Sequence, residues 1–157
     1  NMSSRLFNEV REKRGLAYEI GTGLKRFADT GAFLVHAGID NRKVEDCLGL
    51  IFQELGKVRK ALVRPDEFKR AKEFYLGQLA LALEDTMEYM LWIGESVACL
   101  DKAYSLKQVI EEVNKVNMED LRRVAAQVFD NKKINLSLIG PLEKSEKNIY
   151  RRLSNLG

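Results

Sequence analysis

Apolar positions in the first forty residues predict a short helix followed by two strands. Ser3 or Ser4 can cap the helix and Gly15 is suited to end it. The segments LAYEIGTGL (16–24) and GAFLVHAGI (31–39) are rich in aromatic and β-branched residues, as strands are. Only the polar stretch KRFADT separates them, so an antiparallel hairpin is the simplest pairing. The inner face of the helix would hold Leu6, Phe7 and Val10.

Beyond the hairpin, apolar residues recur at helical spacing. A helix capped by Asp40 or Asn41 would carry an apolar stripe at i, i+3, i+4, i+7 and i+8. A second helix would start at about Pro65, a residue suited to a first helical turn, and run to about Leu100. Either of its internal glycines could bend this very long helix. The first stripe comprises Val44, Cys47, Leu48, Ile51, Phe52, Leu55 and Val58.

The last third of the chain predicts two short helices and a strand. Ser105 and Gln108 form a capping box before one helix, and Asn117 caps the next. INLSLIG (134–140) has the alternation of a third strand, and a polar helix is expected over 143–153. These elements describe an α+β domain with a small, mainly antiparallel sheet of three strands, covered by about five helices.

The length and the element count bear on domain organisation. A chain of 157 residues suits a single domain, 1–157, with a real core. Three strands are few for so many helices, and sheet edges are normally paired or covered. Together with an abrupt start at Asn1, this shortage leads us to expect that the first strands of the domain precede the sequence, which would be a truncated part of a longer chain.

The composition is that of a globular protein and favours neither a nucleic-acid-binding nor a membrane protein. Hydrophobic residues make up 45% and charged residues 31%, as in globular proteins, and the net charge is only +3. No block of like charges points to nucleic acid or an anionic membrane as a partner, and no apolar run approaches the ~20 residues of a membrane span. Cys47 and Cys99 stand among apolar neighbours, so we expect buried free thiols and a cytoplasmic protein.

Candidate catalytic chemistry is sparse. His36 is the only histidine, so the zinc motifs HExxH and HxxEH are absent. The sequence also lacks the GxSxG motif of serine hydrolases and a phosphate-binding loop. We interpret His36 as a hydrogen-bonded, partly buried strand residue and expect no metal site. The basic residues Arg11, Lys13 and Arg14 lie in a last helical turn, where the helix dipole alone favours them.

The stretch MSSRLFNEVREKRGLAYEI, followed by DTGAFLVHAGI, carries a family resemblance. It resembles the C-terminal half of the zinc metallopeptidases related to pitrilysin, insulin-degrading enzyme and mitochondrial processing peptidase, especially the bacterial processing-peptidase-like members. The similarity continues through RPDEFKRAKEFYLGQLALALEDT and YSLKQVIEEVNKVNMEDLRRVAAQVF to INLSLIGPL, so it covers nearly the whole chain in order. One departure is Asn1, where family members tend to carry glycine.

The resemblance implies a fold and a site. The family is built from homologous α+β domains, two in each half of a clamshell around a peptide chamber, with the zinc motif in an N-terminal domain. In the matching domain an arginine and a tyrosine, spaced as in VREKRGLAY, reach towards the zinc site. Residue by residue these are Arg11, which would hold the substrate backbone, and Tyr18, which would donate a hydrogen bond to the scissile carbonyl.

The resemblance also implies a function for the chain. We expect the C-terminal, non-zinc-binding domain of a zinc endopeptidase, inactive alone, with zinc in the full-length protein. Its partners would be a peptide or unfolded protein substrate, the N-terminal zinc-binding domain of the same chain and, in a dimer, a second copy or a different subunit. The alternative is a non-catalytic subunit or scaffold that binds peptide or a partner subunit, which an upstream HxxEH would disfavour. An unrelated α+β interaction domain is the remaining reading.

Overall fold

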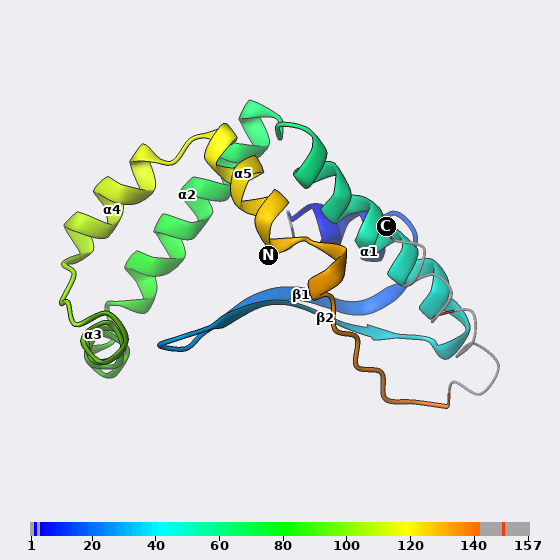
Figure 1. Cartoon of the computed structure of the whole chain (residues 1–157), viewed down its shortest axis with the longest axis horizontal. Helices are drawn as coiled ribbons and strands as arrows, with labels where there is room; N and C mark the ends of the chain where they lie inside the picture. Colours follow the sequence, from blue (N-terminus) through cyan, green and yellow to red (C-terminus); the bar gives the residue numbers. More distant parts are fainter. Residues whose placement is uncertain (1, 3, 142–148, 150–157) are drawn as a thin grey trace. The chain divides into compact units, whose positions relative to one another are not determined.

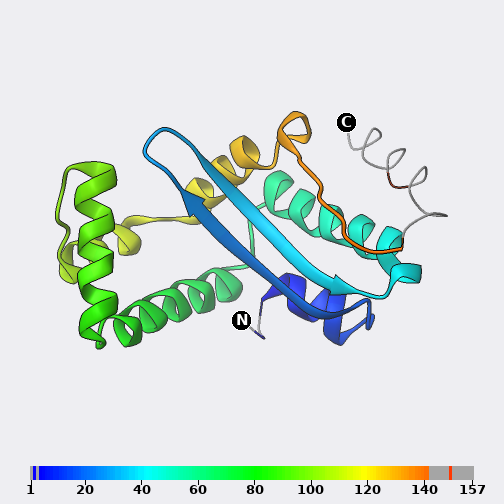
Figure 2. The ribbon, with the colours of Figure 1, turned by 90° about the horizontal axis from the view of Figure 1, so that it is seen from below.

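A β-hairpin organises the first part of the chain (Figure 1). In the computed structural model, which describes residue 2, residues 4–141 and residue 149, β1 (Ala17–Arg26) and β2 (Gly31–Ile39) form a two-stranded sheet. The Phe27 N–H donates to the Thr30 carbonyl at 2.9 Å and closes the turn. The two strands run side by side along their length (Figure 2), which confirms the predicted antiparallel hairpin.

The helix that precedes the hairpin is wider than an α-helix. η1 (Phe7–Glu12) is a π-helix, in which the Lys13 N–H donates to the Asn8 carbonyl five residues earlier. A helical turn starts at Arg5, just before η1, and the Ser4 hydroxyl oxygen accepts from the Phe7 N–H at 3.3 Å, which confirms the predicted serine cap. π-turns are rare and are found frequently at functional sites.

Two helices follow the hairpin and complete the hydrophobic core. Asp40 accepts a hydrogen bond from the Arg42 N–H and caps the 3-10 helix η2 (Asn41–Lys43), which leads into α1 (Val44–Lys60). η1, one face of the hairpin and α1 enclose a cluster of buried side chains. The predicted inner face of the first helix is part of this cluster. The cluster consists of Leu6, Phe7, Val10, Ala17, Ile20, Cys47, Leu50 and Ile51.

The expected long helix from Pro65 to Leu100 is wrong. The structure has two helices, α2 (Pro65–Ala82) and α3 (Thr86–Leu100), separated by a turn. The Asp85 carboxylate caps α3 by accepting from the N–H groups of Met87 at 2.8 Å and Glu88 at 3.0 Å. The apolar periodicity continues through Asp85, so the sequence pattern does not reveal the end of α2. The break also falls at neither of the glycines expected to bend the helix, Gly77 and Gly94.

The next two helices start where their caps predicted. Ser105 and Gln108 form the expected reciprocal capping box at α4 (Leu106–Lys115). The Asn117 side chain accepts from the Asp120 N–H at 2.9 Å at the start of α5 (Met118–Val128). After α5 a 3-10 turn, η3 (Asn131–Lys133), ends the helical part of the described chain.

The predicted third strand is also wrong. Residues 134–140 belong to no strand, although Ile134, Leu136 and Leu138 are partly buried and the residues between them are exposed (orange in Figure 1). The alternation of the sequence is therefore present without the pairing, because the described sheet has only β1 and β2. The polar helix expected over 143–153 lies outside the described residues, apart from Ile149.

Contacts divide the chain into two units. The first holds the described parts of 1–25, 33–61 and 122–157, and the second holds Arg26–Ala32 and Leu62–Leu121. The Phe33 and Phe129 rings meet edge to face at 5.0 Å in the first unit, and the Arg59 guanidinium donates to the Phe129 carbonyl. In the second, Lys72 donates to the Asn114 carbonyl at 2.9 Å. Among the described helices, none combines the length and apolar character needed to cross a bilayer.

Candidate functional site

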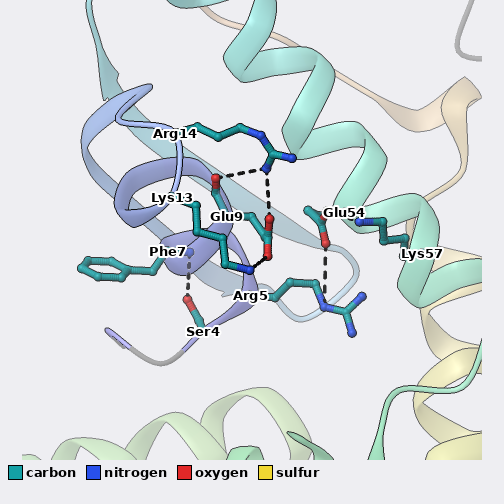
Figure 3. Close-up of polar contacts among 8 residues, drawn as sticks. All are labelled: Ser4, Arg5, Phe7, Glu9, Lys13, Arg14, Glu54 and Lys57. Atoms are coloured by element: carbon teal, nitrogen blue, oxygen red, sulfur yellow. Dashed lines mark hydrogen bonds and ion pairs between the residues drawn. The ribbon is translucent and has the colours of Figure 1, made fainter.

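Two of the three basic residues at the end of η1 are committed to one carboxylate. Lys13 and Arg14 both donate to the side chain of Glu9, Arg14 at 3.0 Å (Figure 3). The hydrogen bond from Lys13 is the main cause that lowers the pKa of Glu9 below its ordinary value. These two cations therefore have a structural partner within their own turn.

Arg11 is placed differently. Its guanidinium lies over the Phe7 ring, 4.8 Å from the centroid, and its Nε is 3.9 Å from a carboxylate oxygen of Glu12. The Arg11 side chain is 44% exposed, and a 3.9 Å approach between exposed groups is a weak ion pair. The ring supports the guanidinium from one side, and this weak pairing leaves it able to bind a carbonyl or carboxylate.

Tyr18 stands at the start of β1 with its side chain in solvent. It is 73% exposed, and its ring lies across Gly38 of the neighbouring strand. A methyl group on Gly38 would lie 2.2 Å from Cζ and 2.5 Å from the hydroxyl oxygen of Tyr18. The hydroxyl end of this exposed side chain thus lies over the bare backbone of Gly38.

The turn between η1 and β1 fixes the spacing of these two residues. Gly15 adopts a φ of 56°, which favours glycine, and its N–H donates to the Arg11 carbonyl at 3.0 Å. The Leu16 N–H donates to the Val10 carbonyl and Lys43 Nζ donates to the Gly15 carbonyl, both at 2.9 Å. The described contacts include no direct bond between Arg11 and Tyr18, so a ligand would have to join them.

His36 departs from its expected setting. It is exposed rather than partly buried, and its ring lies against Gly21 of β1, where an added methyl group would be 2.6 Å from Nε2. The strand alternation placed it correctly on a strand, but the pairing with a glycine leaves the imidazole in solvent.

The donor atoms of the described chain do not suit zinc. No group of three His, Cys, Asp or Glu side chains among the described residues could hold a metal ion. Cys47 and Cys99 are free thiols, and Cys47 is fully buried. Burial raises the pKa of the Cys47 thiol to about 11, which disfavours the thiolate that a metal would need. No step of zinc chemistry is therefore assigned to residues of this chain.

A buried carboxylate of α1 lies beside the chain that leads into η1, and the sequence did not predict its burial. Glu54 of α1 is only 2% exposed and lies 3.9 Å from Arg5 Nε, with Lys57 bound to its other oxygen (Figure 3). Its position between Ile51 and Leu55 on the apolar stripe was the available signal. The same pairing links the chain just before η1 to α1 and so steadies the helix that carries Arg11.

Comparison with known proteins places this arrangement in a family. Residues 1–75 match the model of the Peptidase M16 inactive domain. An uncharacterized zinc protease of Streptomyces coelicolor is 40% identical over 145 residues, which cover 92% of this chain and 31% of the relative. The uncharacterized zinc protease YmxG of Bacillus subtilis is 32% identical over 141 residues, which cover 90% of this chain and 34% of the relative.

The fold has a counterpart among solved structures. A chain of Inz-5-bound complex III2 from Candida albicans is similar with a TM-score of 0.72 and 23% identity, covering 80% of this chain and 30% of that one. The chain spans about a third of the length of the curated relatives it matches. Residues 1–75, which include η1, Arg11 and Tyr18, thus carry the inactive domain of the M16 peptidase family.

Proposed function

We propose that residues 1–157 are the non-catalytic C-terminal domain of a zinc endopeptidase, in which they help to enclose and position a peptide for hydrolysis. The inactive-domain match and the zinc-protease names of relatives about three times as long support this proposal. The zinc site would lie in another domain, since the described part of this chain has no suitable donor cluster.

The proposal depends most on how the side chains between residues 11 and 18 are held. Lys13 and Arg14 are bound to Glu9, whereas the side chains of Arg11 and Tyr18, on either side of the Gly15 turn, are both exposed. A guanidinium fork can hold the carbonyl groups of a peptide backbone. A phenol can donate a hydrogen bond to a carbonyl oxygen as that oxygen gains negative charge.

The partners follow from this role. The domain would act with an N-terminal zinc-binding domain of the same chain, on a peptide or an unfolded protein, in an enzyme that can form a homo- or heterodimer. We place the protein in a reducing cytoplasm, because both of its cysteines are free thiols.

Substitution of Arg11 in the intact protease tests the substrate-holding role. Arg11→Ala should lower kcat/KM on a quenched peptide by about 10- to 100-fold, as expected for the loss of one charge-assisted contact of about 1.5–3 kcal/mol. Zinc content should be unchanged. Lys13→Ala is the matched control, since Lys13 is a neighbouring cation that Glu9 already occupies. Equal activity of the Arg11→Ala variant and the wild type would refute this role.

The isolated chain gives a second test. Incubated with a quenched peptide and added zinc, it should release no product, because its described residues offer no zinc site. Robust cleavage that a chelator abolishes would contradict the proposed non-catalytic role. Peptide binding by an intact protein that retains no hydrolytic activity would instead support the scaffold alternative.

A further inference from the structure

The strand that carries Tyr18 has an irregular burial pattern. Ala17 and Ile20 are both buried, and the two residues between them, Tyr18 and Glu19, are both exposed. Side chains of a regular strand alternate between faces, so buried residues should be an even number of positions apart. Two consecutive exposed residues between two buried ones indicate a β-bulge. The bulge turns Tyr18 to the outer face of the hairpin, away from the core formed by Ala17 and Ile20.

On that outer face the Tyr18 ring lies against the backbone of Gly38. The Tyr18 atoms nearest to a methyl group placed on Gly38 are Cζ, the hydroxyl oxygen and Cε2, at the end of the ring that bears the hydroxyl. A methyl group there would come within 2.2 Å of Cζ, closer than non-bonded carbon atoms approach one another. The side chain is 73% exposed, so the core does not hold the ring, and the Gly38 backbone limits how closely its hydroxyl can approach the sheet.

The backbone conformation of Gly38 does not require glycine. Its φ lies outside the left-handed region, where among the glycines of the described chain only Gly15 and Gly140 are found. An alanine is therefore compatible with the backbone at position 38 and would displace only the ring. Gly21 presents the same arrangement to His36, and Gly23 has open space above it.

We propose that Gly38 is a positioning residue, which seats the Tyr18 ring and thereby places its hydroxyl for contact with substrate. The inference rests on the proposed role of Tyr18 in the intact protease. A displacement of about 1 Å of a catalytic group can cost about 100-fold in rate, so a seat of this kind matters even for an exposed side chain.

NMR spectroscopy of the 157-residue chain tests the seat without any activity. The α protons of Gly38 should show upfield ring-current shifts that disappear in Tyr18→Leu. Gly38→Ala should shift the Tyr18 ring resonances and leave those of core residues in place. Gly21→Ala and Gly23→Ala are matched controls and should leave the Tyr18 ring resonances unchanged. Unshifted Tyr18 resonances in Gly38→Ala overturn the proposal.

Turnover by the intact protease tests the consequence. Gly38→Ala should lower kcat about 10- to 100-fold with unchanged zinc content, while Gly21→Ala and Gly23→Ala keep wild-type kcat. If the glycine acts through the tyrosine, Gly38→Ala combined with Tyr18→Phe should lose no more than Tyr18→Phe alone. If Tyr18→Phe is impaired, two results overturn the positioning role. One is a Gly38→Ala variant with a displaced ring and wild-type kcat, and the other is a double variant whose losses add. Wild-type kcat in Tyr18→Phe overturns the proposed role of the hydroxyl instead, and the positioning role with it.

Discussion

Cys47 reports whether η1, the hairpin and α1 close on one another as described. Its side chain is fully buried in the core cluster, and burial raises its pKa from 9.0 to about 11. At about pH 8 the thiolate would then be roughly 0.1% of the population instead of about 9%, a reduction of about 100-fold before access is considered. Cys99 is partly exposed and unpaired, and serves as an internal comparison.

The assay is the release of thionitrobenzoate from a disulfide reagent by the native chain. One equivalent should react quickly and the second only after denaturant is added, and Cys99→Ser should remove the fast phase. Cys47→Ala should retain the fast phase and lose the second equivalent. Similar rates for both thiols in the native chain would refute the closed core.

The same thiol gives a pH dependence with a definite sign. A raised pKa in the folded chain means that the unfolded chain loses its proton first, so the stabilisation is complete below about pH 9 and is lost as the pH rises through about 11. At ~1.4 kcal/mol per unit, the wild type should lose about 3 kcal/mol relative to Cys47→Ala across this window. Urea unfolding of both chains at each end of the window measures it, and a constant difference would contradict the raised pKa.

The remaining stability predictions concern single side chains. Val10 is fully buried, so Val10→Ala should lower the free energy of unfolding by about 2–3 kcal/mol, from two lost methylene equivalents and the cavity left behind. Val97→Ala, at a position that is 45% exposed, should change it by less than about 0.5 kcal/mol, and equal effects in urea melts would argue against the described core. Asp85→Ala should cost about 1 kcal/mol by removing the cap of α3, seen as lost helical circular dichroism; an unchanged spectrum and melt would show that the cap contributes nothing.

Local signals in the sequence predicted the elements whose cause is local. The glycine that ends η1, the turn of the hairpin and the capping box of Ser105 and Gln108 all depend on residues a few positions apart, and the structure has each of them. The helix break at Asp85 is also local, but its cap interrupts an apolar stripe without interrupting the periodicity. Pattern alone therefore joins α2 and α3 into one helix.

Pairing between distant residues is the part that the sequence could not supply. Residues 134–140 alternate as a strand does, yet alternation does not name a neighbour, and no strand forms there. Likewise, family resemblance singles out Tyr18, but nothing in a single sequence says that Gly38, twenty positions on, lies beneath its ring. The buried Glu54 is similar, because its ion pair joins it to Arg5, forty-nine positions earlier in the chain.

The role of the Tyr18 hydroxyl is the central claim, and one measurement addresses it most directly. In the intact protease, kcat and zinc content are compared for the wild type, Tyr18→Phe and the control Tyr75→Phe, which alters an exposed phenol of α2. Loss of one donor to a developing oxyanion should lower kcat of Tyr18→Phe by about 100-fold or more, with zinc content and the control unchanged. A Tyr18→Phe enzyme with the wild-type kcat would contradict the account.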